Sequence, residues 1–216
     1  GKDFKTYVIP GDTLIIFADL DPNANDINAV QIYGEPGEIC KYYSARRESL
    51  GYWRIEESLT GFNNVLDPVE KAFKTNDSLF RVEMEFLNNY IRANKMPGWF
   101  YQIMKSDLEY NKVSMRPNIV MLRKFFFKET INNPEKLYTF DQVKFYNPKA
   151  KLSDYYYQFI DIYLTARYEY DLGEKHGLER GLPIFERSIP EIKEILKGEI
   201  MEYYLAYKIS QGFSLT

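Results

Sequence analysis

The sequence contains few of the residues that most catalytic and metal sites use. Its single cysteine, Cys40, excludes an intramolecular disulfide, a C-x-x-C redox pair and any multi-cysteine zinc site within these 216 residues. Its single histidine, His176, and the absence of a G-x-S-x-G motif give no basis for a Ser-His-Asp triad. We therefore identify no catalytic, cofactor-binding or metal-ligating residue from the sequence, and we expect no cofactor.

Neither a strong net charge nor a long apolar segment is present. The chain has 28 Lys and Arg against 31 Asp and Glu, with no basic block, which argues against nucleic acid or an anionic membrane surface as the main partner. No apolar run approaches the roughly 20 residues that span a bilayer, so we predict no membrane span. The chain starts with Gly1, which indicates a cleaved tag or a trimmed precursor. Composition therefore leaves the compartment open.

Two segments resemble metal sites but fail on spacing. His176 and Glu179 have an H-x-x-E spacing, yet a site needs three or four ligands, and the adjacent glycines favour an exposed turn. Residues 19–26 resemble the start of a calcium loop, but Ala24 stands where glycine is needed and Val30 where a bidentate glutamate is needed. We interpret residues 19–26 as a solvated turn between strands.

Cys40 has two possible interpretations. It falls in the first turn of a predicted helix beside Lys41, where the helix dipole could lower the thiol pKa and raise its reactivity. Ile39 and Tyr42 flank it, however, and this setting favours a small buried hydrophobic residue. Its reactivity stays open.

Aromatic residues are abundant, at 17% of the chain with 19 Tyr and 15 Phe. This content could suggest stacking on sugars or bases. Large amphipathic rings also fill the interfaces between helices while their hydroxyl groups reach water, and we favour this interpretation for most of them.

The first 35 residues have the pattern of a small antiparallel sheet. We predict a hairpin of strands 6–9 and 14–18 around Pro10 and Gly11, with a third strand at 29–33. Two or three strands are barely stable alone, so residues 1–35 form the end of an incomplete sheet. The apolar run 14–17 suggests burial on both faces, and we expect either a homodimer through this edge or a helix that covers it.

Residues 36–216 form the predicted helical domain, so the chain is mainly α, a bundle of about six helices after a short β-hairpin or three-stranded antiparallel sheet. Residues 38–50 form the first helix. The second begins with Asp67 as the N-cap and Pro68 in the first turn, carries an apolar stripe to Ile91, and has a possible break at 75–78. The stripe residues are Val69, Phe73, Phe80, Met84, Leu87 and Ile91.

Proline and serine mark the later predicted helices. Pro97 begins one with Phe100, Ile103 and Met104 inward, and Pro117 begins another with Ile119, Leu122 and Phe126 inward. Ser153 caps a helix with the stripe Leu152, Tyr156, Phe159 and Tyr163. The last helix runs from Ser188 to Gly212 with Ile192, Leu196, Ile200, Tyr203 and Tyr207 on one face.

A resemblance covers most of the chain. Residues 9–16 with their Pro10-Gly11-Asp12 turn, residues 32–34 leading into a helix, and the aromatic helices from 67 to 127 resemble the region before the thioredoxin fold in TlpA-like thiol-disulfide oxidoreductases of Bacteroidetes. The terminal helix, with its step at 196–199, is similar to the helix that precedes the catalytic domain there. That domain needs a C-x-x-C pair, which this chain lacks, so no redox residue is carried over.

The resemblance implies that this chain has a non-catalytic function. We expect a non-catalytic accessory module in the periplasm or cell envelope, which positions a thioredoxin-fold domain of the same parent chain or a protein client. The parent would be the enzyme. The alternative is a free-standing helical protein that binds a glycan or a peptide, with Tyr155, Tyr156, Tyr157, Trp53 and Trp99 exposed in one concave patch.

Overall fold

The computed structural model describes residues 15–18, 30–51, 67–129, 131, 138–171 and 190–213. The mainly helical class is confirmed in this part of the chain. The α-helices are α1 (Glu35–Leu50), α4 (Val69–Ala93), α5 (Gly98–Phe127), α6 (Asp154–Asp171) and α8 (Glu199–Phe213), with a short helix at 190–195. Two 3₁₀ turns, η3 (Phe140–Gln142) and η4 (Pro148–Ala150), precede α6, and β1 (Ile15–Ala18) pairs with β2 (Val30–Tyr33).

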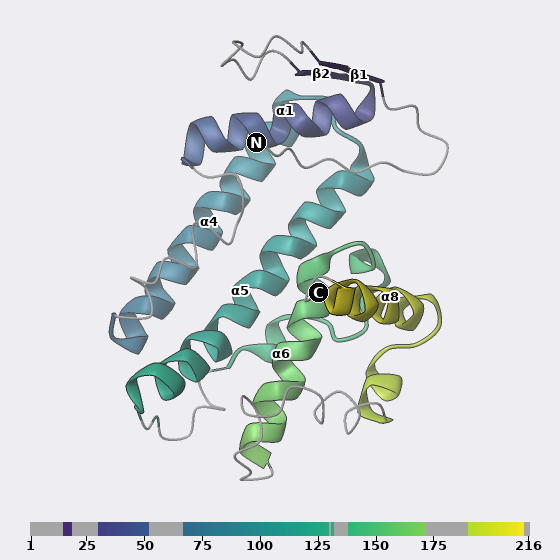
Figure 1. Cartoon of the computed structure of the whole chain (residues 1–216). Helices are drawn as coiled ribbons and strands as arrows, with labels where there is room; N and C mark the ends of the chain where they lie inside the picture. The colour runs from purple at the N-terminus through teal and green to yellow at the C-terminus, as the bar shows by residue number, and fades with distance from the viewer. Residues whose placement is uncertain are drawn as a thin grey trace.

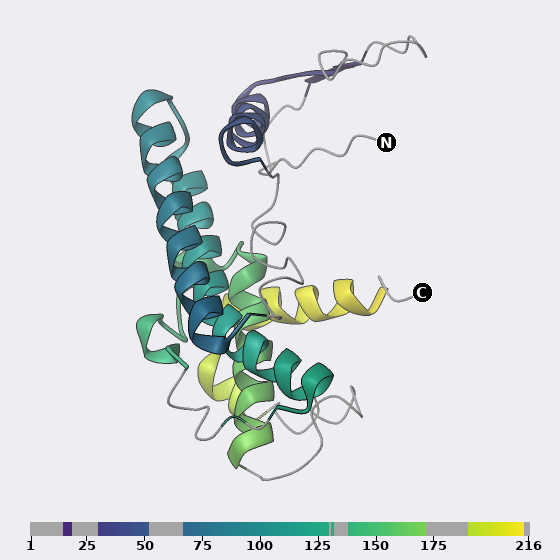
Figure 2. The ribbon, with the colours of Figure 1, turned by 90° about the vertical axis from the view of Figure 1, so that its left-hand side faces the viewer.

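Helix α5 is the centre of the bundle. It packs on α4 along one side and on α6 along the other, and η4 also contacts it (Figure 1). Helix α1 lies across the upper end of α4 and α5, and α8 crosses α6 (Figure 1). Seen from the side, α8 extends away from α6 with its C-terminal end pointing outward (Figure 2). Most of the described chain is therefore organised around one 30-residue helix.

The predicted inward residues of the first half of α5 are confirmed. Phe100, Ile103 and Met104 are buried, and so are Val69, Phe73 and Leu87 of the α4 stripe. Phe80, Met84 and Ile91 pack against this core while remaining partly exposed. Helix α4 runs through residues 75–78 without the break that their low helix propensity suggested, because its apolar stripe packs along its length.

The two described strands form one antiparallel pair in which Ile15 lies opposite Tyr33 and Ala18 opposite Val30. The predicted strand at 6–9 and its turn lie outside the described residues, so the hairpin stays a prediction. Burial on both faces is wrong for Ile15, which is 46% exposed, while Tyr33 opposite it is 50% exposed. The pair lies at the upper edge of Figure 1, next to α1, which is the described helix that contacts β2.

The helix predicted to begin at Pro117 does not exist, because α5 continues through this residue. Pro117 removes the one backbone hydrogen bond to the Val113 carbonyl, at a cost of about 3 kcal/mol. Pro117, Ile119 and Val120 are all buried, so packing on both neighbouring helices offsets this cost. Further along α5, the prediction that Leu122 and Phe126 face inward is wrong.

Leu122 and Phe126 are 38% and 52% exposed, because the last turns of α5 extend to the lower end of the molecule (Figure 1).

The predicted cap of α4 is also wrong. Pro68, not Asp67, occupies the N-cap position, and no side chain caps this end. The carboxylate of Asp67 instead accepts from Lys71 Nζ at 2.8 Å, because proline sets an extended backbone that turns Asp67 away from the free amides. Ser153, in contrast, caps α6 as predicted: Tyr156 N donates to its hydroxyl oxygen at 3.2 Å.

The last predicted helix is divided in two. A helix at 190–195 ends at residues 196–198, and α8 begins at Glu199. Gly198 has φ of 57°, a left-handed conformation that glycine adopts readily and that ends a helix. Ile192, Leu196 and Ile200 are buried as predicted, but Tyr204 rather than Tyr203 faces inward on α8.

Candidate functional site

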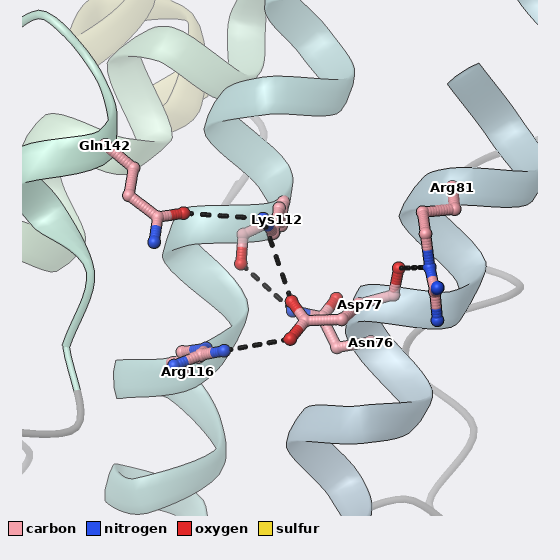
Figure 3. Close-up of polar contacts among 6 residues, drawn as sticks. All are labelled: Asn76, Asp77, Arg81, Lys112, Arg116 and Gln142. Carbon is pink, nitrogen blue, oxygen red and sulfur yellow. Dashed lines mark hydrogen bonds and ion pairs between the residues drawn. The ribbon is translucent and has the colours of Figure 1, made fainter. Parts of the chain in front are cut away.

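A polar network joins the middle of α4 to α5 and η3 (Figure 3). Asp77 on α4 faces two cations of α5: its carboxylate lies 3.0 Å from Arg116 Nη2 and 3.8 Å from Lys112 Nζ. Lys112 also donates to Gln142 of η3 at 3.4 Å. Beside them, Asn76 donates through Nδ2 to the Lys112 carbonyl at 3.0 Å. The network therefore connects three elements that are far apart in the sequence.

Each of the two cations of the polar network also contacts an aromatic ring of α4. Lys112 Nζ lies 4.9 Å from the centre of the Phe80 ring, and the Arg116 guanidinium lies 5.0 Å from that of Phe73. Their charges thus face a carboxylate on one side and an aromatic ring on the other. This arrangement aligns α4 with α5, and it presents no nucleophile beside a base.

A second polar contact, the ion pair of Arg46 and Glu83, is fully buried. Arg46 of α1 donates from Nε to Oε2 of Glu83 at 2.9 Å and from Nη2 to Oε1 at 2.5 Å, and the two side chains are 1% and 2% exposed. Such two-point pairing satisfies both charges in a low-dielectric setting. This pair fixes α1 on α4.

One weak signal of this pair is present in the amino-acid pattern. Arg46 follows Tyr42 by four residues and Glu83 precedes Leu87 by four, so each charge lies on an apolar helix face. A charge on such a face is a hint that a partner is buried with it.

Three tyrosines hold the segment before α6 in place. Tyr110 of α5 donates to the Lys144 carbonyl, and Tyr156 and Tyr157 of α6 donate to the carbonyls of Phe145 and Lys151, each at 2.6 Å. Burial raises the pKa of all three hydroxyls, and that of Tyr156 to about 12. We call Tyr110, Tyr156 and Tyr157 the tyrosine anchors.

Asp161 of α6 clamps α8. Its Oδ1 accepts from the Tyr204 hydroxyl, and its Oδ2 lies 2.8 Å from Lys208 Nζ. Burial, together with the Asp161 charge, raises the pKa of Tyr204 above its ordinary value. We call this set the Asp161 clamp.

Of the residues considered for metal binding or thiol reactivity, the described part of the chain contains Cys40. Cys40 is half-buried in the second turn of α1, because that helix begins at Glu35, so the predicted place in the first turn is wrong and the dipole argument weakens. His176, Glu179, the loop 19–26 and Trp53 lie outside the described residues. In the described part of the chain, no group of three or more His, Cys, Asp or Glu side chains could hold a metal ion.

The aromatic residues in the described part bear on the binding alternative. Tyr155, Tyr156 and Tyr157 are buried, and the half-buried Trp99 packs edge-on against Phe100 with ring centres 6.1 Å apart. These rings fill the core and do not form an exposed patch.

Comparison with known proteins gives no relative: no protein-family model, no curated protein and no solved structure matches the chain. Among the described helices, none is both long and apolar enough to cross a membrane.

Proposed function

We propose that this chain is the non-catalytic accessory module of a thioredoxin-like thiol-disulfide oxidoreductase in the periplasm or cell envelope of a Bacteroidetes species. One observation carries the proposal: the polar clusters described above each join elements of the chain itself. The buried ion pair joins α1 to α4, the polar network joins α4 to α5 and η3, and the Asp161 clamp joins α6 to α8. The module positions a redox domain or its client.

Two further observations support this proposal. The single cysteine cannot form a C-x-x-C pair, so any dithiol chemistry belongs to another domain. The small strand pair at the edge of the helical bundle agrees with the end of a larger sheet, as the resemblance implies. We expect upstream strands, or a second copy of the chain, to extend this pair.

The alternative, a free-standing protein that binds a glycan or a peptide, has less support. It requires exposed aromatic rings in one patch, whereas Tyr155, Tyr156 and Tyr157 are in the core.

Reduction of insulin by dithiothreitol tests the proposal. We expect the rate with residues 1–216 to equal the rate without protein, and to equal that of a Cys40→Ser variant. A thioredoxin sample verifies that the assay works. Catalytic turnover by the wild-type chain, lost in Cys40→Ser, would contradict a non-catalytic role.

A further inference from the structure

The segment between η3 and η4 turns basic and aromatic side chains outward. Lys144 and Tyr146 are exposed, whereas Phe145 between them is half-buried and packs against the core. This alternation is typical of an extended chain with one inward and one outward side. Lys149, in η4, is exposed as well. We call residues 144–149 the basic loop.

The basic loop carries positive charge that is not balanced within the described part of the chain. Residues 142–153 contain three lysines and no Asp or Glu, in a chain with a net charge of -3. Lys151, just after the loop, pairs with Glu199 at 2.8 Å. Lys144 and Lys149 form no ion pair with the described residues. The loop therefore has two lysines that can pair with carboxylates of another molecule.

The backbone of the basic loop is held from its inner side. The tyrosine anchors donate to three backbone carbonyls at 2.6 Å each, two of them in the loop and one just after it. The side chain of Asn147 accepts from Lys149 N at 3.2 Å and donates to the Tyr110 hydroxyl at 3.0 Å. A loop fixed in this way presents its outward side chains in one arrangement, which lowers the entropy cost of binding.

The size and composition of the basic loop favour a short acidic segment of a protein as the partner. Anionic membranes are bound by clusters of about four to eight basic residues, and nucleic acids by larger basic surfaces. The Cα atoms of Lys144 and Lys149 are at most about 18 Å apart, a length that about six residues of extended chain span. Tyr146 lies between them and is 50% exposed, and tyrosine is frequent at the centre of protein interfaces.

We propose that the basic loop docks an extended acidic segment of a protein client, with carboxylates on Lys144 and Lys149 and an apolar side chain on the Tyr146 ring. The inference deepens the proposed function, because a module that positions a client needs a surface that recognises it. Exposed charge pairs contribute mostly to orientation and to the rate of association. We therefore expect binding that weakens as the salt concentration rises.

Fluorescence anisotropy of a labelled oligoglutamate peptide tests this with the chain 1–216 in about 50 mM NaCl. We expect binding by the wild-type chain and a rise in Kd of about tenfold in Lys144→Glu/Lys149→Glu. Tyr146→Ser should raise the Kd about threefold without a change in charge, since it removes the ring that the peptide stem contacts. Circular dichroism checks that the variants keep their helix content.

The matched control is Arg92→Glu/Lys95→Glu, which changes the net charge by the same amount. Both residues are exposed and lie in or just after the last turn of α4, beside α1. We expect its Kd to stay within about twofold of the wild-type value.

Four outcomes would overturn the inference. Absence of peptide binding up to about 1 mM shows that the loop is not an acidic-segment site. Equal weakening in both double variants assigns the binding to net charge alone. Binding to phosphatidylglycerol vesicles but not to the peptide assigns the loop to lipid headgroups. A dimeric mass by light scattering that becomes monomeric in Lys144→Glu/Lys149→Glu assigns it to a second copy of the chain. Each of these leaves the non-catalytic role intact, because insulin reduction tests that role separately.

Discussion

The two halves of the described bundle differ in the partners that their buried polar groups have. Where α1, α4 and α5 meet, charges are paired with charges, as in Arg46 with Glu83 and Arg116 with Asp77. Where α5, α6 and α8 meet, the buried contacts are made mainly by hydroxyl groups: the tyrosine anchors donate to backbone carbonyls, and the one ion pair described there, Asp161 with Lys208, is partly exposed. A buried charge left alone is far more costly than an unpaired carbonyl, so the first half should be the more sensitive to single substitutions.

The largest expected effect comes from breaking the buried ion pair. Arg46→Met or Glu83→Leu alone should lower the free energy of unfolding by about 3–5 kcal/mol, because each leaves an uncompensated buried charge. The double variant should lose much less than the sum of the two, since neither charge remains. Urea denaturation of the four proteins measures this coupling. Additive losses would show that the two charges are stabilised by other groups.

Alkaline pH should destabilise mainly the half of the bundle where α5, α6 and α8 meet. The unfolded chain releases the proton of Tyr156 near pH 10, whereas the folded chain keeps it until about pH 12. Between these values the unfolded state binds fewer protons, so stability falls as pH rises, by about 1 kcal/mol per pH unit for this residue.

Tyr110, Tyr157, Tyr204 and Tyr207, whose pKa values are also raised, should add to this fall. Denaturation midpoints from pH 8 upward measure it, and Tyr156→Phe should reduce the slope. A flat profile above pH 10 would mean that these hydroxyls ionise within the folded protein.

Much of the bundle could be predicted because amphipathic spacing is a local signal. The α4 stripe from Val69 to Leu87 and the Ser153 cap are examples. Local signals failed where packing overrides them: Pro117 was predicted to begin a new helix, yet it lies inside α5. The Arg46–Glu83 pair could not be found, because its partners are 37 residues apart and each charge is interpretable only with the other.

Substitution of Gly198, which divides the last predicted helix in two, should have a smaller effect on stability. Gly198→Ala should cost about 1 kcal/mol, because φ of 57° strains any residue with a Cβ, although no atom lies within 4 Å of the added methyl group. Gly98→Ala, equally free of neighbours and without a positive φ, is the control and should change stability by less than about 0.5 kcal/mol. Thermal unfolding measures both. Equal effects would show that Gly198 has no conformational role.

The half-exposed polar network should give the smallest effect. Asp77 is 37% exposed, so Asp77→Asn should cost about 0.5 kcal/mol at low salt and less in 1 M NaCl, where screening weakens its contacts with Lys112 and Arg116. The cost of Tyr156→Phe, in contrast, should not change with salt. If both costs fell equally, the distinction between the two halves would be wrong.

The most direct test of the account is the gene sequence that follows the codon for Thr216. An accessory module should be followed by a thioredoxin-fold domain, so we expect a C-x-x-C pair between a predicted strand and a helix within one domain length, about 100–200 codons. A stop codon at that point, or a following domain without the cysteine pair, would contradict the account.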